Sequence, residues 1–368
     1  MQETFYFGAG PATLPKIVLD KIKNELIDYC GTGLSVLELS HRSNEFIEIM
    51  NRAENLMREL MGVPDDYAVL LLHGGATTQY SMLPINFIRS GEVADYICTG
   101  HWSQKACNEA RKFSDINQID AIVDSKLISI KPTDQWGLSK RASYIHYCEN
   151  ETISGVMNDV AGIDEINLNE STLFCDMTSS ILTRPTKVKD FGLIYASAQK
   201  NLGVAGLCVV VVRKDLLEDV PEKNSNFIPK VFDYKKCYED KSLVNTPPTF
   251  AIYVLGLMLD WLKAEGGVAE IYNRGQQYSK SLYELIDTSK LYKNNVDIKY
   301  RSNVNIPFVI EDINLHEKFI SHAENNHLLG LRGHNSVGGV RVSLYNAIPA
   351  SGVEALLGFM RSFELSYS

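Results

Sequence analysis

The sequence predicts an α/β protein whose core is a buried, mixed and mostly parallel sheet. Short apolar runs bounded by turn residues alternate with helical patterns over the first two-thirds of the 368 residues, which is typical of βαβ units. Hydrophobic residues make up 45% of the chain and charged residues 22%, so a substantial core can be buried. The pattern changes character near Ala264, which predicts a large domain over residues 1–263 and a smaller C-terminal α/β domain over 264–368.

The large domain is predicted to contain two prominent helices and a series of short strands. Apolar residues between Phe46 and Leu60 recur at helical spacing, which indicates a helix with one buried stripe. A more apolar helix over Thr249–Ala264 ends before Gly266-Gly267. The predicted strands are Tyr67–Leu72, Asp95–Thr99, Tyr144–Cys148, Thr172–Asp176, Leu193–Ala196 and Leu207–Val212.

The C-terminal domain is predicted to begin with a helix over Val268–Ile286 and to close with a helix after Pro349. The strands predicted between them are Val296–Tyr300, Pro307–Ile310 and Gly339–Ser343.

The bulk composition argues against several classes of function. A formal net charge of -9 disfavours nucleic acid or an anionic membrane as the main partner. The chain has no apolar run long enough to span a membrane and no secretory signal at its start, so we expect a cytoplasmic enzyme. The seven cysteines form no CxxC pair and the eight histidines form no HExxH motif, so neither a disulfide framework nor a protein-held metal is expected.

A loop of small residues follows the first predicted strand. His73 to Gln79 reads HGGATTQ and leads into a helical pattern. Backbone N–H groups at such a helix start can neutralise a phosphate, although a tight strand-to-helix turn explains the same residues. Another stretch, Gly8–Thr13, superficially resembles a dinucleotide-binding fingerprint. Its last glycine is missing and no ordinary βαβ unit surrounds it, so NAD binding is rejected.

Asp176 and Lys200 are the candidate catalytic residues. Asp176 ends an apolar strand, where a carboxylate could pair with a protonated pyridine nitrogen. A helix-cap or turn aspartate is the alternative. Lys200 follows the strand Leu193–Ala196, and a partly desolvated lysine amine can form a Schiff base and shuttle protons. Most lysines are simply solvated, so the interpretation of Lys200 depends on its neighbours.

Each candidate site segment lies at the C-terminal end of a predicted strand. These segments are the Gly74 loop, Trp102, Thr152, Asp176 and Lys200. The carboxyl ends of parallel strands meet at one edge of a sheet, so the segments would assemble a single crevice. Trp102 could stack on a planar ring there, although a buried structural tryptophan is the commoner explanation of an isolated one.

A set of motifs extends over nearly the full length, from GAGPATLP at the start to GGVRVSLYNAIP near the end. Between them lie ELSHRS (Glu38–Ser43), HGGATTQ, TGHW (Thr99–Trp102), NETISG (Asn150–Gly155), CDMTSSILTRP (Cys175–Pro185), ASAQKNLG (Ala196–Gly203) and NTPPTF (Asn245–Phe250). In these motifs the chain closely resembles the phosphoserine aminotransferases, a family of fold-type-I pyridoxal-phosphate transferases.

The resemblance implies which residues hold the cofactor, pyridoxal 5'-phosphate. Lys200 would form the Schiff base and Asp176 would pair with the pyridine nitrogen. Trp102 would stack on the ring, and Thr152 would hydrogen-bond its phenolic oxygen. The cofactor phosphate would be held by Ala76, Thr77 and Gln199, and by Asn245 and Thr246 from the partner subunit of a homodimer with shared active sites.

The resemblance also implies the substrates. The amino group would move reversibly between glutamate and 3-phosphohydroxypyruvate, giving O-phosphoserine and 2-oxoglutarate in serine biosynthesis, with Lys200 as the general base. His41, Arg42, His334 and Arg341 match positions that hold carboxylate and phosphate groups.

Two positions depart from the family pattern. Asn335 stands where many members carry arginine, and Thr77 stands where several do. The cofactor residues are intact, but fewer charges are left to recognise a substrate phosphate. Arg332 either contributes charge near Asn335 or is a solvated surface residue.

Three alternatives stay open from the sequence. Another small-amino-acid aminotransferase with an altered substrate would share the cofactor residues. A desulfurase-like lyase would need a mobile cysteine near the cofactor, and Cys237 is the only candidate, without a supporting motif. A catalytically idle cofactor-binding protein needs neither a base nor an electron sink, so Lys200 and Asp176 argue against it.

Overall fold

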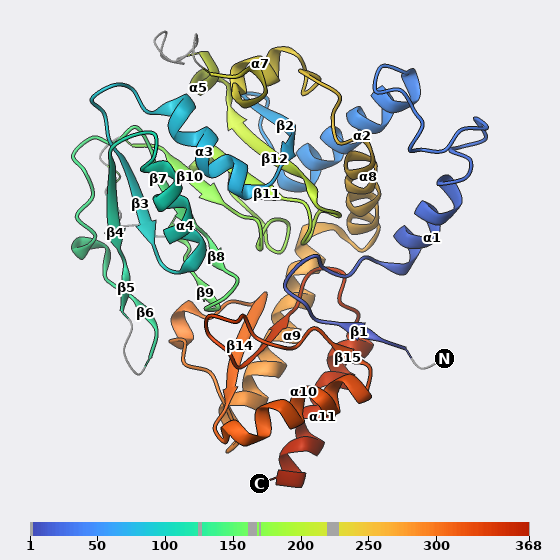
Figure 1. Ribbon diagram of the computed structural model, residues 1–368, viewed down its shortest axis with the longest axis vertical. Helices are drawn as coiled ribbons and strands as arrows, with labels where there is room; N and C mark the ends of the chain where they lie inside the picture. Colours follow the sequence, from blue (N-terminus) through green and yellow to red (C-terminus); the bar gives the residue numbers. More distant parts are fainter. Residues whose placement is uncertain (1–2, 124–126, 161–167, 169–170, 219–227, 368) are drawn as a thin grey trace.

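A seven-stranded sheet forms the centre of the larger part of the molecule (Figure 1). The computed structural model describes residues 3–123, 127–160, 168, 171–218 and 228–367. The strand order is β2-β12-β11-β10-β7-β3-β4, and every neighbouring pair is parallel except the two that involve β12. The predicted α/β class with a mixed, mostly parallel sheet is confirmed. The strands are β2 (Tyr67–Gly74), β3 (Ala94–Cys98), β4 (Ile116–Asp120), β7 (Ile145–Cys148), β10 (Leu173–Asp176), β11 (Leu193–Ser197) and β12 (Gly206–Arg213).

The reversed strand β12 determines where the ends of the other strands lie. β11 leads directly into β12 through the segment that contains Lys200, and the Ala198 N–H donates to the Leu207 carbonyl at 2.9 Å across this turn. Because β12 is antiparallel to both β11 and β2, β2 points in the same direction as β11. The carboxyl ends of β2, β3, β7, β10 and β11 therefore lie at one edge of the sheet, where open α/β folds bind ligands.

Helices cover both faces of the sheet, and alternate strand residues contribute to two separate cores. Val69 of β2 packs into the core that includes α2 and α8. Its neighbour Leu70 points to the opposite face and packs into the core that includes α3 and α4. The helices predicted over 46–60 and 249–264 are both present. The four covering helices are α2 (Asn44–Met61), α3 (Ala76–Phe87), α4 (His101–Ala110) and α8 (Thr249–Ala264).

Helices α2 and α8 run side by side in the same direction. Arg52 donates two hydrogen bonds of 2.8 Å to Asp260, and Lys263 pairs with Glu59 at 2.7 Å. Position along one helix therefore increases with position along the other. The segments that precede the two helices lie at the same end of the pair.

The C-terminal part has its own three-stranded antiparallel sheet, in the order β13-β14-β16, with helices packed around it (Figure 1). A separate apolar core joins this sheet to α9, α10 and α11. The elements are α9 (Gly267–Thr288), β13 (Tyr292–Lys293), β14 (Asn305–Ile310), α10 (His316–Asn325), β15 (Leu328–Leu329), β16 (Val340–Ser343) and α11 (Ala350–Tyr367).

The N-terminus packs with the C-terminal part of the chain. β1 (Phe5–Tyr6) pairs in parallel with β15, and Phe7 is buried in the C-terminal core. The next residues, Ala9 and Gly10, return to the large sheet, where the Ala12 N–H donates to the Gln199 carbonyl at 2.8 Å. The first segment of the chain thus contacts both parts of the molecule. The division near residue 264 stays a prediction.

The strand predicted over Val296–Tyr300 is wrong. Residues Ile298–Tyr300 form a single 3-10 turn, and the Asp297 carboxylate caps it by accepting the Lys299 N–H at 3.1 Å. Ile298 is 77% exposed, so the apolar residue that suggested a buried strand faces solvent. An aspartate that captures a nearby backbone N–H favours a turn over a sheet ladder.

The remaining elements are short, apart from one exposed helix near the N-terminus. None of the helices within the described ranges combines the length and the hydropathy needed to cross a membrane. The elements are α1 (Lys16–Glu25), β5 (Ile122–Val123), β6 (Ser129–Ile130), β8 (Asn150–Glu151), β9 (Val156–Met157), α5 (Lys214–Glu218) and α7 (Tyr234–Glu239).

Candidate active site

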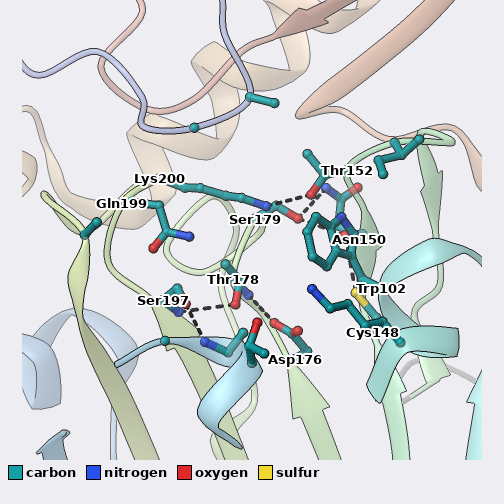
Figure 2. Close-up of a pocket in the computed structure, with 18 of the residues that line it drawn as sticks. Trp102, Cys148, Asn150, Thr152, Asp176, Thr178, Ser179, Ser197, Gln199 and Lys200 are labelled. Carbon is teal, nitrogen blue, oxygen red and sulfur yellow. Dashed lines mark hydrogen bonds between the residues drawn. The ribbon is translucent and has the colours of Figure 1, made fainter. Parts of the chain in front are cut away.

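A cavity of about 620 Å³ lies at the carboxyl edge of the central sheet (Figure 2). Its walls come from the loops after β2, β3, β7, β10 and β11, from the N-terminal segment and from β16. The five loops are far apart in the sequence and meet because their strands share one edge of the central sheet. The predicted site residues that line the cavity are Ala76, Thr77, Trp102, Thr152, Asp176, Gln199, Lys200, His334 and Arg341.

Lys200 extends into the cavity from the β11–β12 turn. Its Nζ donates a 2.7 Å hydrogen bond to Thr152 Oγ1 (Figure 2). The residue is only 8% exposed, and burial lowers the pKa of Lys200 to about 8, although the negative charge of Asp176 opposes this shift. A substantial fraction of the amine is therefore neutral near physiological pH, as a nucleophile or proton acceptor requires.

Asp176 is a buried carboxylate at the end of β10. The Thr178 N–H donates to Oδ1 at 2.9 Å, and the Tyr80 hydroxyl donates to Oδ2 at 3.2 Å. Burial raises the pKa of Asp176, and the Thr178 and Tyr80 donors together with the charge of Lys200 oppose that rise. No basic side chain in the described residues forms an ion pair with it. Such a carboxylate suits a cationic ligand group.

The N-terminus of α3 forms a cradle of small residues. The Ala76 N–H donates to Ser197 Oγ at 2.5 Å, whereas the Thr77 N–H has no acceptor among the residues that the structure describes. A Cβ on Gly75 would lie 2.7 Å from Ser197 Oγ and would displace that hydroxyl. An unpaired amide at the start of a helix is suited to binding an anion such as a phosphate.

Trp102 forms a wall of the cavity near Lys200. The Lys200 Nζ lies 5.9 Å from the centroid of the indole ring. In Figure 2 Trp102 and Thr152 lie on one side of the cavity, and Gln199 lies on the other. A flat aromatic ligand could therefore occupy the space between these walls and contact the indole face.

Arg341 and His334 line the cavity from the C-terminal part of the chain. Arg341 lies on β16, and burial lowers the pKa of its guanidinium. It forms no ion pair within the described ranges, so it is available to a carboxylate of a substrate. His334 is exposed, and its ring centroid lies 5.8 Å from that of His101.

Four predicted site residues do not line the cavity of their own subunit. His41 and Arg42 precede α2, and Asn245 and Thr246 precede α8. Because the two helices are parallel, all four residues lie at the same end of the pair. Arg42, Asn245 and Thr246 are exposed and His41 is partly exposed.

The structure favours one of the two interpretations of Arg332. Its guanidinium pairs with both carboxylate oxygens of Glu317, at 2.6 and 2.9 Å, on the exposed surface. Arg332 therefore already has an acidic partner and is best described as a surface residue. Asn335 lies on the exposed loop before β16. Because Arg332 is paired with Glu317, it does not supply a free positive charge in place of the arginine that Asn335 replaces.

Cys237 does not have the properties that a desulfurase would need. It lies in α7, outside the residues that line the cavity, and it is 3% exposed. Burial raises the pKa of the Cys237 thiol to about 12, so the thiolate is scarce at neutral pH. The geometry disfavours this alternative.

Sequence reasoning missed several residues that complete the cavity. Tyr80 and Thr178 hold the Asp176 carboxylate, and Ser197 binds the amide of Ala76. Thr178 and Ser197 lie within motifs already singled out, at short distances from Asp176 and Lys200. Tyr80 is four residues after Ala76, on the same face of α3, and this helical spacing was the available signal.

The fold and the cavity define a class of protein, and sequence comparison gives the same class. The chain belongs to the class-V aminotransferases, whose family profile matches residues 4–356. It is 46% identical to the phosphoserine aminotransferase of Acinetobacter baylyi, over 98% of both chains. It is 44% identical to that of Nitrosomonas europaea, over 100% of both chains.

Solved structures give the same result. The phosphoserine aminotransferase from Bacillus circulans subsp. alkalophilus superposes with a TM-score of 0.93 at 36% identity, covering 100% of this chain and 99% of that one. The pyridoxal-phosphate-bound enzyme from Trichomonas vaginalis superposes with a TM-score of 0.90 at 35% identity, covering 98% of this chain and 100% of that one.

Proposed function

We propose that this chain is a pyridoxal-phosphate-dependent aminotransferase that transfers an amino group between glutamate and 3-phosphohydroxypyruvate, yielding O-phosphoserine and 2-oxoglutarate in serine biosynthesis. The observation that carries this proposal is the full-length similarity to relatives named phosphoserine aminotransferase. The buried Lys200 amine in a cavity that also holds Asp176 and Arg341 supports it independently.

The residues of the cavity fit pyridoxal phosphate. The open amide of Thr77 at the start of α3 would hold the phosphate. Asp176, buried without an ion-pair partner among the described residues, would pair with the pyridine nitrogen. Lys200 would attach the aldehyde, and Trp102 would cover the ring. When bound, the cofactor supplies an electron sink for the bonds around the substrate amino carbon.

The cavity residues have separate roles in proton transfer and in substrate binding. The Lys200 amine, with a pKa of about 8, would take the proton from the substrate α-carbon and deliver it to the cofactor carbon that receives the amino group. Arg341 holds the α-carboxylate through its planar guanidinium. His334, at the exposed mouth, faces the distal anionic group of the substrate.

The four site residues outside the cavity support a homodimer with shared sites. His41, Arg42, Asn245 and Thr246 gather at one end of the α2–α8 pair, outside the cavity of their own subunit. The N-terminal segment beside them exposes large apolar side chains, such as Ile27 at 81%, which an interface would cover. In the proposed dimer these residues reach the cavity of the partner subunit.

Comparison of two acceptors tests the proposed substrate. With glutamate as donor, we expect kcat/KM for 3-phosphohydroxypyruvate to exceed that for hydroxypyruvate by about 100-fold or more, because a phosphate adds charge-assisted hydrogen bonds. A coupled assay of 2-oxoglutarate release measures both. Equal values for the two acceptors would contradict a phosphorylated substrate and favour a related small-amino-acid aminotransferase.

The pH dependence of cofactor attachment tests the state of Lys200. Only the neutral amine attacks an aldehyde, so the rate at which apoprotein binds pyridoxal phosphate covalently should rise with pH and level off above about pH 8. Stopped-flow absorbance of the cofactor measures this rate. A rate that keeps rising toward the ordinary lysine pKa of 10.5 would show that the amine is not perturbed.

Dilution tests the shared site. If Asn245 and Thr246 complete the phosphate site of the partner subunit, conditions that dissociate the dimer should release cofactor, and Asn245→Ala should raise the dissociation constant for pyridoxal phosphate by about tenfold. Light scattering combined with cofactor absorbance follows both events. A monomer that keeps cofactor and full activity would rule out sharing.

A further inference from the structure

Two helices begin at the cavity, and their N-termini are used differently. Both α3 and α4 have glycine at the N-cap, Gly75 and Gly100, so neither has a side-chain cap of its own. At α3 the Thr77 amide has no acceptor among the described residues. At α4 the corresponding amides are bound by an acidic residue from another part of the chain.

That acidic residue is Glu151. Its Oε2 accepts the Trp102 N–H at 2.9 Å, and its Oε1 accepts the Ser103 N–H at 2.9 Å and the Ser103 hydroxyl at 2.6 Å. Glu151 is completely buried. Burial raises the pKa of this carboxylate, and the Ser103 and Trp102 donors oppose the rise. The positive end of the α4 dipole also stabilises the negative charge.

Gly100 is required for this arrangement. A Cβ at Gly100 would lie 2.5 Å from Glu151 Cδ and 2.6 Å from Cγ. A serine or asparagine at this position would cap α4 locally, but it would exclude the Glu151 carboxylate. The chain thus caps α4 with a residue 49 positions beyond Trp102.

The location of Glu151 gives this cap a second consequence. The next residue is Thr152, whose hydroxyl accepts the Lys200 Nζ–H at 2.7 Å. The Glu151 side chain therefore fixes the backbone of Trp102, and the residue next to it in the chain, Thr152, carries the hydroxyl that contacts Lys200. Movement of α4 relative to this loop would separate the indole wall from Lys200.

We propose that Glu151 is a positioning residue that caps α4 from the β7–β8 side and so holds the Trp102 indole in register with Thr152 and Lys200. This inference rests on the proposed function, because Trp102 matters in this way only if the cavity binds a planar cofactor. Glu151 itself does not line the cavity, and it acts through Trp102.

The variant Glu151→Gln tests the proposal, with Glu149→Gln as a matched control. Glu149 is also buried and lies two residues earlier, between β7 and β8, but its carboxylate pairs with Arg184 at 2.6 Å instead of with α4. In apoprotein of Glu151→Gln, hydrogen exchange at the Trp102 and Ser103 amides should be at least about tenfold faster. In Glu149→Gln these two amides should keep their protection.

Cofactor binding gives the second measurement. For Glu151→Gln we expect the dissociation constant of pyridoxal phosphate to rise about tenfold and the circular dichroism of the bound cofactor band to weaken, because the ring and the indole lose their fixed orientation. Glu149→Gln should change neither, even if it lowers the melting temperature by a similar amount.

Two outcomes would overturn the proposal. One is a folded Glu151→Gln protein with protected amides and unchanged cofactor affinity, and the other is an equal loss in Glu149→Gln, which would indicate general destabilisation. If Glu151→Gln fails to fold, Ser103→Ala leaves the Glu151 carboxylate in place and removes its 2.6 Å contact with the Ser103 hydroxyl, together with the bonds of that hydroxyl to Thr99 and Gly100. This variant should show the same changes to a smaller degree. Amide exchange needs no cofactor, so this result stays interpretable if pyridoxal phosphate does not bind at all.

Discussion

Lys200→Ala should abolish transamination, with a loss of roughly 10⁴-fold or more in kcat. The substitution removes both the amine that attaches the cofactor and the base that moves the α-proton. The pKa of about 8 makes this amine suited to both tasks. Glutamate-dependent turnover measures the first loss. Borohydride reduction followed by peptide mapping should find the cofactor on the peptide that contains Lys200 in the unmodified protein and on no peptide in the variant.

Lys105→Ala provides the matched control. Lys105 lines the same cavity, and its Nζ lies 5.4 Å from the Trp102 ring, close to the 5.9 Å of Lys200. It is exposed, however, and lies on the surface of α4. The Lys105→Ala protein should still be labelled on Lys200. Full activity in Lys200→Ala, or labelling on Lys105, would end the assignment of Lys200.

Asp176→Asn should lower kcat/KM by about 10²–10³-fold, or roughly 3–4 kcal/mol of transition-state stabilisation. The amide keeps the size of the side chain but removes the negative charge that would keep the pyridine nitrogen protonated. Cofactor should still bind through its phosphate, so absorbance separates loss of binding from loss of catalysis.

A milder substitution tests the same role of the Asp176 carboxylate. Tyr80→Phe removes only the 3.2 Å hydrogen bond to Asp176 and leaves the carboxylate charged. We expect it to reduce kcat/KM less than Asp176→Asn does. Turnover of Asp176→Asn close to that of the unmodified protein would return Asp176 to the role of a turn residue.

The strands and helices that the sequence predicted well are those with a strong local signal. β2, β10 and β12 are continuous apolar runs because both of their faces are covered, and α8 is apolar along its length for the same reason. The edge strand β4 was missed because its sequence, INQID, alternates polar and apolar residues and is only partly buried. The 296–300 segment was misread because an apolar residue was taken as a sign of burial.

The candidate site shows a similar division. Lys200 and Asp176 were identified because each lies at the carboxyl end of a recognisable strand. Glu151 was quoted within a motif but given no role, because its partners Trp102 and Ser103 are close only in the folded chain. The common location of Arg42 and Asn245 also depends on tertiary structure, because the parallel packing of α2 and α8 places the segments before both helices at the same end.

The contact between the two ends of the chain has a consequence for biosynthesis. The Tyr345 hydroxyl donates to the Ala9 carbonyl at 2.8 Å, across a separation of 336 residues. At about 5–20 residues per second, the ribosome needs roughly 17–67 s to add the intervening residues. All seven strands of the central sheet have been synthesised well before Tyr345 is made. The Tyr345 contact with Ala9 can therefore form only at the end of translation, whereas the Ala12 contact with Gln199 needs only residues made much earlier.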